Sequence, residues 1–292
     1  MSSISSSTLN SPWSKVRKTL LNLLPWTTDP DTMSSTESFS GEGSFFSPSP
    51  TDIGLVRTAL KSTKPALPTE LADMILDFAD YNVKDVAENT FLQSRYSVQD
   101  PLSAGVVVPG PLIREMKLDG PELRDLKIKS VRFELASRDQ GWGGEHNTQG
   151  TYNCAWSWFE VTILRPQENP TTATDASEID FDSRHRDPED FSDSYQRCGW
   201  DFVRDERGKA RGWSVQSNRV ATREIELHEI LWEADGGKKD LEEPGEDNGS
   251  GTGEGFIGAL RPGDLIILWA RALFPGWANY VERARVEVEY TG

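Results

Sequence analysis

The side chains that could do catalytic or metal chemistry in this chain are few and far apart. The three histidines, His146, His185 and His228, have no second ligand at the short spacing of a metal motif such as H-E-x-x-H. Cys154 and Cys198 form no C-x-x-C pair, the usual signature of a structural zinc site. We therefore predict a non-enzymatic protein with no catalytic residues, no metal and no cofactor. An enzyme would need acids or histidines that the fold gathers in a pocket.

Two segments look like ligand-binding loops but lack residues that such loops require. The run GSGTGEG, at 249–255, has Glu254 where G-x-G-x-x-G needs its third glycine, and no lysine follows it as in a P-loop. The run DFDSRHRD, at 180–187, has alternating carboxylates but neither the central glycine nor the terminal glutamate of a calcium loop. We predict a flexible loop at the first segment and a solvated linker at the second.

Two tryptophans remain as candidates for ligand binding. Trp142 follows Asp139 and Gln140 in a turn bounded by glycines, and Trp277 stands near Asn279 in an FPGW loop. An aromatic ring beside amide and carboxylate groups suits the recognition of a sugar, and equally serves as a hot spot for a peptide. Alternatively, the two rings wedge their turns against the core. The candidate ligand-binding residues are Asp139, Gln140, Trp142, Trp277 and Asn279.

Charge and composition exclude several classes of protein. The formal net charge of −16 opposes broad nucleic-acid binding, because an acidic surface repels the phosphate backbone. The longest apolar run, Leu265–Phe274, is far shorter than the roughly 20 residues that cross a bilayer. Acidic residues concentrate in two insertions, 167–195 and 234–255, which we expect to be solvated. Two cysteines and the lack of a secretory signal favour a reducing compartment, the cytoplasm or nucleus.

The elements that must position these residues are mostly strands. In KIKSVRFELASR, Val131, Phe133 and Leu135 alternate with charged residues, as in a half-buried strand. The apolar run DLIILWARALF predicts a central strand covered on both sides. We expect an antiparallel β-sandwich over 98–292, because about eight strands occur without long helices between them. The expected strands are 105–113, 128–136, 151–164, 199–203, 212–220, 223–232, 264–274 and 281–290.

A helix is predicted from Pro68 onward. Leu71, Met74, Ile75 and Phe78 recur at steps of three and four residues and form one apolar stripe. Val86 and Phe91 predict a second short helix, so that helical structure extends over 64–97. Because so short a segment cannot fold alone, it must dock on the sandwich or on another protein.

Residues 1–63 form a Ser/Thr/Pro-rich arm that we expect to be disordered. Within it, SPWSKVRKTLLNLLPW predicts a short basic amphipathic helix at 12–25. Such a helix could contact a membrane surface, a partner groove or an import receptor, which leaves a mitochondrial location as an alternative. The other interpretation is that nothing there is ordered.

Two parts of the chain together resemble a group of fungal proteins. LPTELADMILDFADY resembles the start of an F-box, in which a Leu-Pro pair leads a helix that packs on a Skp-type adaptor of a ubiquitin ligase. SRDQGWGG, YNCAWSWFEV, EIELHEILWE and the C-terminal segment from Arg261 resemble the β-sandwich that follows such helices, similar to jelly-roll, galactose-binding-like and F-box-associated domains. An F-box normally continues through further helices, and this chain departs from that pattern. The resemblance implies that adaptor contacts are made by Leu67, Pro68, Leu71, Ile75 and Leu76. The candidate partner-binding residues on the helix are Leu67, Pro68, Leu71, Met74, Ile75 and Phe78.

Two functional hypotheses follow. In the first, the protein is a substrate adaptor of a ubiquitin ligase, and its sandwich binds a protein or glycoprotein. In the second, it is a free-standing intracellular carbohydrate- or ligand-binding module whose helix is structural. The two hypotheses differ in whether the stripe on the helix is exposed or buried against the sandwich.

Overall fold

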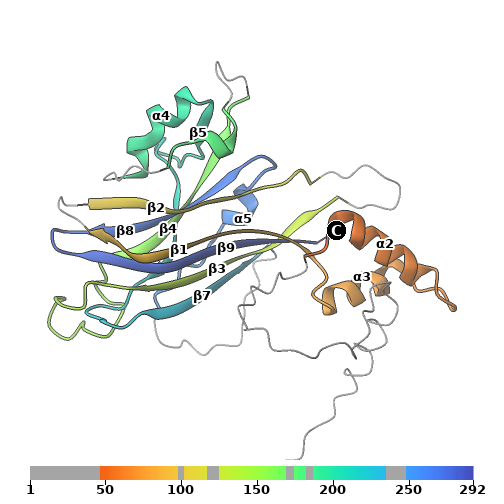
Figure 1. Ribbon diagram of the computed structural model, residues 1–292, viewed down its shortest axis with the longest axis horizontal. Helices are drawn as coiled ribbons and strands as arrows, with labels where there is room; N and C mark the ends of the chain where they lie inside the picture. Colours follow the sequence, from red (N-terminus) through yellow and green to blue (C-terminus); the bar gives the residue numbers. More distant parts are fainter. Residues whose placement is uncertain are drawn as a thin grey trace, which may run out of the picture. The chain divides into compact units, whose positions relative to one another are not determined.

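The computed structural model describes residues 47–97, 102–116, 125–168, 174–181, 187–234 and 248–291. The chain separates into two units, Met1–Phe45 and Phe46–Gly292, and every described residue belongs to the second. The helix expected at 12–25 therefore lies outside the described residues. The described residues form nine strands in two antiparallel sheets, together with short helices (Figure 1). The prediction of a mainly β, antiparallel fold is confirmed.

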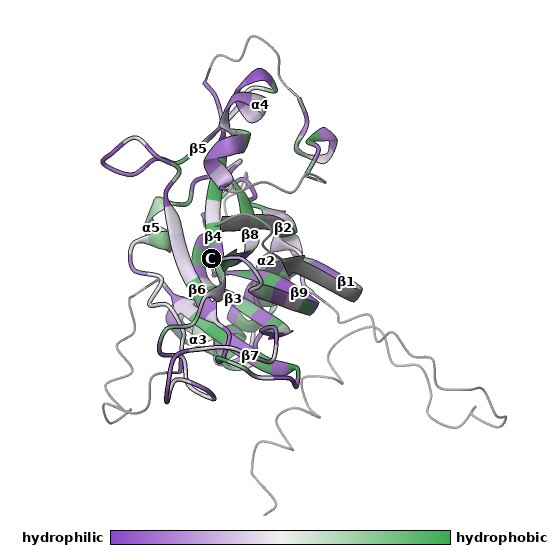
Figure 2. Ribbon diagram, turned by 90° about the vertical axis from the view of Figure 1, so that its left-hand side faces the viewer, coloured by the Kyte–Doolittle hydropathy of each residue, from purple (hydrophilic) through white to green (hydrophobic). Residues whose placement is uncertain are grey.

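The first sheet has the strand order β1-β9-β3-β7, and every neighbouring pair is antiparallel. Its central strands carry the alternation expected from the sequence, with apolar residues facing inward and charged residues facing outward, and Figure 2 shows that alternation along β9. On the outer face, Arg283 bonds Glu88 of the neighbouring strand at 2.7 Å. Cross-strand ion pairs of this kind let one face of the sheet meet solvent. The strands are β1 (Val83–Ser97), β3 (Lys127–Arg138), β7 (Glu226–Glu233) and β9 (Ala278–Thr291).

The second sheet has the order β2-β8-β4-β5, and β6 also pairs with β4. Its strands are β2 (Leu102–Leu112), β4 (Ser157–Pro166), β5 (Trp200–Phe202), β6 (Gly212–Ser217) and β8 (Leu265–Leu273). The two sheets share one hydrophobic core, to which Phe133 and Val286 contribute from the first sheet and Phe159 and Leu268 from the second. All four side chains are fully buried, so this core is the main source of stability.

The central strand β8 is covered on both sides, as its apolar sequence predicts. Ile266 and Leu268 belong to the core between the sheets, whereas Ile267 and Trp269 belong to a second apolar cluster on the opposite face. A strand buried on both faces has no polar side to alternate with, which explains its continuous apolar run.

The second cluster corrects the expectation of a solvated insertion at 167–195. Most of the linker expected at 180–187 lies outside the described residues. Within the described parts of that insertion, Ile179, Phe191 and Tyr195 are buried. Tyr195 lies on α4 (Ser192–Arg197), and the rings of Phe191 and Trp269 are 5.3 Å apart. The high acidic content hid a few apolar residues that β8 recruits as a cover for its outer face.

The glycine run at 249–255 is also packed rather than free, contrary to the expected flexible loop. The Gly251 N–H donates to the Val215 carbonyl at 2.9 Å, and the Trp232 indole N–H donates to the Gly251 carbonyl at 2.9 Å. A Cβ on Gly251 would overlap the carbonyl oxygen of Ser214. Glycine is therefore needed here because two backbones approach closely before the short helix α5 (Phe256–Ala259).

Two helices precede the sandwich, α2 (Pro50–Lys61) and α3 (Thr69–Phe78). The expectation of a disordered arm through residue 63 is wrong for α2, which has a clear start signal. Ser49 and Asp52 form a capping box there, and Pro50 occupies the first turn.

The expectation of helical structure through residue 97 is wrong from Val83 onward. This segment is the strand β1, paired with β9 from Val83 opposite Tyr290 to Ser97 opposite Ala278. The local sequence pattern of this segment is weak, and pairing with a strand almost 200 residues away along the chain makes it a strand.

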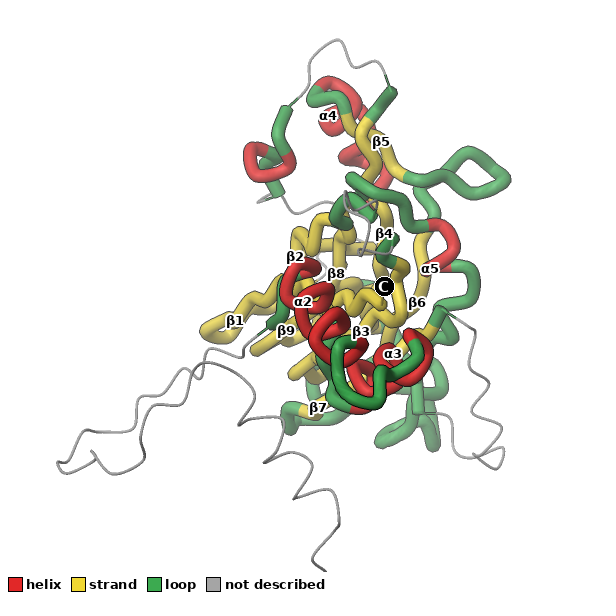
Figure 3. Tube along the Cα trace, turned by 90° about the vertical axis from the view of Figure 1, so that its right-hand side faces the viewer, coloured by secondary structure: helices red, strands yellow, loops and turns green. Residues whose placement is uncertain are grey.

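Helices α2 and α3 lie at the end of the sheets where strand β9 ends (Figure 3). Among the described helices, none has both the length and the apolar character needed to cross a membrane.

Candidate functional site

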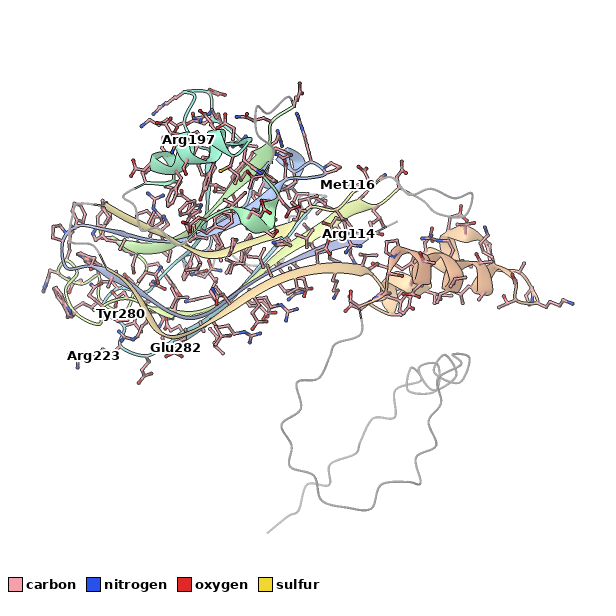
Figure 4. The ribbon with its side chains drawn as sticks, turned by 45° about the horizontal axis from the view of Figure 1, so that its top comes forward. Arg114, Met116, Arg197, Arg223, Tyr280 and Glu282 are labelled. Atoms are coloured by element: carbon pink, nitrogen blue, oxygen red, sulfur yellow. The ribbon has the colours of Figure 1, made fainter. Side chains whose placement is uncertain are left out.

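The predicted site residues lie at opposite ends of the same strands. At the start of β3, Lys129 reaches α3 through an ion pair with Asp77. At the end of β3, the Arg138 guanidinium stacks 4.0 Å from the ring centroid of Tyr280. Figure 4 shows Tyr280, Glu282 and Arg223 at this second end, away from the helices, and Arg114 and Met116 nearer to them. The structure therefore separates the helical candidates from the loop candidates.

One side of α3 holds the helix on the sandwich. Ala72 is fully buried, and Leu76 is 5% exposed and belongs to the main core. Asp73 accepts a hydrogen bond from Arg57 of α2 at 2.6 Å, and only 4% of Arg57 is exposed. These contacts fix the orientation of α3, so its other side has a defined position.

The other side of α3 presents apolar side chains to solvent. Phe78 is 86% exposed, Met74 53% and Leu71 45%. These three residues, spaced by three and four positions, are called here the apolar face of α3. Large exposed apolar side chains grouped on one surface mark interaction sites more often than isolated ones do. The stripe recognised in the sequence is thus largely exposed, because the helix packs through Ala72 and Leu76 instead.

The remaining residues predicted on this helix have mixed positions. Ile75 and Leu67 are half-buried, and Pro68 is exposed at the N-cap of α3. Leu76, implied by the F-box resemblance, is buried in the core. It supports the helix rather than presenting a contact.

The charge on α3 has one sign. The helix contains Glu70, Asp73 and Asp77 and no lysine or arginine. Asp73 forms an ion pair with Arg57, and Asp77 forms one with Lys129. Glu70, in contrast, is exposed beside Leu71. A partner that covers the apolar face would meet an acidic border and would fit best with basic residues at its rim.

At the opposite end, the structure brings Trp142 and Trp277 together. The ring of Trp142 lies against Gly276, and that of Trp277 lies near Gly143. Trp156 and Phe274 extend the group, with ring centroids 4.9 Å apart in an edge contact. We call Trp142, Trp156, Phe274 and Trp277 the aromatic end. Trp142 is 58% exposed and Phe274 44%, and the other two rings are half-buried.

The polar residues predicted beside these tryptophans are occupied by internal hydrogen bonds. Asp139 is fully buried and accepts from the backbone N–H groups of Gly141 and Ala221 at 2.7 and 2.6 Å. Burial raises the pKa of its carboxyl group, and the backbone donors counter that effect. Gln140 accepts from the Ala278 N–H at 3.3 Å and donates to the Trp142 carbonyl at 2.6 Å. These two residues therefore build the turn that carries Trp142.

Asn279 has the same internal role on the neighbouring loop. It is fully buried, donates to the Trp158 carbonyl at 2.9 Å and accepts from Asn218 at 3.0 Å. None of the three predicted polar side chains offers its hydrogen-bonding groups to an outside ligand. These three residues therefore build the aromatic end, while exposed polar side chains follow Trp142 in the same turn at Glu145, His146 and Asn147.

The sequence interpretation missed Trp156 and Phe274 as members of the aromatic end, and the more exposed of the two is Phe274. Its backbone has φ of +72°, a left-handed conformation that is strained for a bulky residue. Such strain costs about 1–3 kcal/mol and persists where surrounding contacts over-determine it. Here the edge contact with Trp156 holds the ring in place while nearly half of it stays exposed. The FPGW sequence carried a signal, because Pro-Gly favours a turn and turns lie mostly at the surface.

A polar pocket of about 550 Å³ lies where the insertion meets the second sheet. At its base, Arg271 is 4% exposed and bonds Glu160 at 2.9 Å and Asp187 at 3.1 Å. Burial raises the pKa of Glu160, and Arg271 counters that effect. Asp187 also caps the turn at 188–191. These bonds join the insertion to β4 and β8. The three side chains therefore help to hold the insertion on the second sheet.

In the described part of the chain, no group of three or more His, Cys, Asp or Glu side chains is placed to hold a metal ion.

Comparison with known proteins does not identify a family for this chain, since no family model and no curated protein matches it. Three features remain as candidate functional sites: the apolar face of α3, the aromatic end, and the polar pocket, which gathers the carboxylates of Glu160, Asp187, Glu189, Asp190 and Asp205.

Proposed function

We propose that this protein is a non-enzymatic recognition protein, an F-box-like substrate adaptor that docks on a Skp-type protein through the apolar face of α3. The observation that carries the proposal is the exposure of Leu71, Met74 and Phe78 on a helix whose opposite side is fixed in the core. A helix that only completed the sandwich would turn its largest apolar residues inward. This helix leaves them available to a groove on a partner.

The aromatic end would capture the substrate in the same proposal. Its exposed surface includes the rings of Trp142 and Phe274, and the neighbouring Asp139, Gln140 and Asn279 are engaged internally. Sugar recognition requires free polar groups beside a stacking ring, whereas a protein hot spot requires an aromatic anchor that can be desolvated. The geometry therefore favours a protein ligand over a glycan.

The alternative function is a free-standing carbohydrate- or ligand-binding module with a purely structural helix. The exposed ring of Trp142 supports a binding role of either kind. The occupied polar groups around it support the glycan form less well. In both cases we propose a sandwich of jelly-roll or galactose-binding-like type, a location in the cytoplasm or nucleus, and membership of the fungal group that the sequence resembles.

The test is a calorimetric titration of the full chain with a purified fungal Skp-type adaptor. The variant carries Met74→Asp and Phe78→Asp, which remove the two most exposed side chains of the apolar face and leave Ala72 and Leu76 in place. We expect the parent to bind and the variant to lose roughly 2 kcal/mol or more, about thirtyfold in affinity.

The matched control is Leu227→Asp, since Leu227 on β7 is 85% exposed, almost the same as Phe78. This variant should bind the adaptor as the parent does. A parent that does not bind at all, or a control that fails together with the α3 variant, would contradict the proposal and favour the free-standing module.

A further inference from the structure

The outer edges of the two sheets are protected to different degrees in the described residues. β2 carries Pro109 and Pro111, β1 has a register shift between Thr90 and Ser94, and β6 is bridged by Ser250. β5 has only three residues. By contrast, β7 has eight residues, no proline and an unbroken register with β3. Prolines, bulges and short length are the usual means of protecting an edge, so β7 is the edge most open to pairing.

The hydrogen-bond pattern shows which residues of β7 face away from the sheet. The Ala234 N–H donates to the Lys129 carbonyl at 2.9 Å, at the continuation of the β3–β7 ladder. Bonded and non-bonded pairs alternate in an antiparallel ladder, so Trp232, Ile230 and His228 also bond β3. The N–H and C=O groups of Leu227, Glu229, Leu231 and Glu233 therefore point away from β3, and no described strand pairs with β7 on that side.

The same four residues place their side chains on the outer face of the sheet, opposite Ala136, Glu134, Arg132 and Ser130. Leu227 is 85% exposed and Leu231 is 38% exposed, and both glutamates are exposed. Along the edge, apolar and acidic positions therefore alternate, and Glu229 is paired with Arg132 of the neighbouring strand β3. β7 contains no lysine or arginine. A strand that paired here would be favoured by basic residues beside the glutamates and apolar residues beside the leucines.

We propose that β7 binds an extended segment of a protein partner by strand addition, and that the outer side of this segment alternates apolar and basic residues. This inference rests on the recognition role proposed above but uses a different surface. Leu227 lies opposite Ala136, two residues before the end of β3 at Arg138. A ligand anchored on the aromatic end could therefore continue along β7.

The experiment uses the full chain and two synthetic nine-residue peptides. The first, VTKTVTKTV, alternates valine and lysine on one side of a strand with threonine on the other, and the second replaces its lysines with glutamates. Hydrogen exchange followed by NMR reports the protection of individual amides. We expect the basic peptide to protect the amides of Leu227, Glu229 and Leu231 in a salt-sensitive way, and the acidic peptide to leave them unprotected.

Two substitutions at one position separate backbone pairing from charge. Glu229→Pro deletes an outward N–H and no bond to β3, so an edge strand tolerates it. Glu229→Gln keeps the N–H and removes the charge, together with the ion pair to Arg132. We expect the proline variant to weaken binding of the basic peptide about tenfold or more, and the glutamine variant to weaken it by a smaller factor.

Three results would overturn the inference: equal binding of both peptides, protection away from β7, or no protection by either peptide. Self-association of the chain that Glu229→Pro abolishes would also overturn it, because β7 would then pair with a second copy. None of these results bears on adaptor binding by α3, so failure of this inference and failure of the proposed function remain distinguishable.

Discussion

Trp142 and Trp232 differ in environment, although the sequence places both in the sandwich. Trp142 is 58% exposed, whereas Trp232 is 5% exposed and packs 4.8 Å from the ring centroid of Phe133. We expect Trp142→Ala to change the free energy of unfolding by less than about 1 kcal/mol, and Trp232→Ala to lower it by about 3–5 kcal/mol. Urea unfolding of both variants checks this. A cooperative loss of several kcal/mol in Trp142→Ala would identify its ring as part of the core and remove it from the binding surface.

His228 gives the stability of the protein a specific dependence on pH. Burial, together with the charge of Arg219, lowers the pKa of His228, and its Nε2 atom is buried with no hydrogen-bond partner among the described residues. The unfolded chain therefore binds the proton at higher pH than the folded chain does. The contribution of His228 to stability is present above the ordinary histidine pKa of about 6.5 and is lost as the pH falls below it.

Replacement of His228 by glutamine should remove this part of the pH dependence. We expect the thermal midpoint of the parent to fall more than that of His228→Gln between about pH 7.5 and about pH 5.5. Differential scanning calorimetry at several pH values measures the two slopes. Parallel slopes would show that the histidine titrates alike in the folded and unfolded states.

At the scale of elements, two glycines offer a matched pair of substitutions. A Cβ on Gly251 would overlap the Ser214 carbonyl oxygen, whereas a Cβ on Gly258 in α5 would meet no atom within 4 Å. We expect Gly251→Ala to destabilise the fold by about 1–3 kcal/mol. Gly258→Ala should be neutral or stabilising by up to about 1 kcal/mol, because alanine favours a helix. Equal unfolding midpoints for the two variants would contradict the close packing of the glycine run.

The sequence predicts the elements whose pattern is local and misses those decided by distant partners. The alternation in β3 and the continuous apolar run in β8 are enough to identify both strands. For β1 the sequence predicts a helix, because Val86 and Phe91 suggest one, whereas pairing with β9 makes the segment a strand. The acidic insertion hid Phe191 and Tyr195, which find their partner only once Trp269 faces outward.

The same distinction applies to the candidate sites. Helical spacing identified the stripe on α3, but only the structure shows that Leu71, Met74 and Phe78 remain exposed. The sequence also placed Asp139, Gln140 and Asn279 near the tryptophans, where the structure has them, without revealing that backbone groups occupy them. Some of these hydrogen-bond partners are local, such as the Gly141 N–H, but others come from loops distant in sequence, such as the Ala221 N–H that also donates to Asp139.

At the scale of the whole described unit, the proposed function depends on two surfaces that are separated by the length of the strands. The apolar face of α3 lies at the end of the sheets where β3 begins, and the aromatic end lies where β3 finishes. The twelve residues of β3, at roughly 3.3 Å per residue, separate the two surfaces. A protein bound at one surface therefore need not obstruct a protein bound at the other. This arrangement suits a protein that joins an adaptor to a substrate.

The most direct test is hydrogen exchange followed by mass spectrometry on the full chain, with and without a purified Skp-type adaptor. The account predicts slower exchange in peptides that cover 69–78, because docking suppresses local opening of α3, and unchanged exchange in peptides that cover 139–150 and 274–279. Slower exchange at the aromatic end with none at α3 would contradict the account, as would a complete lack of protection at saturating adaptor.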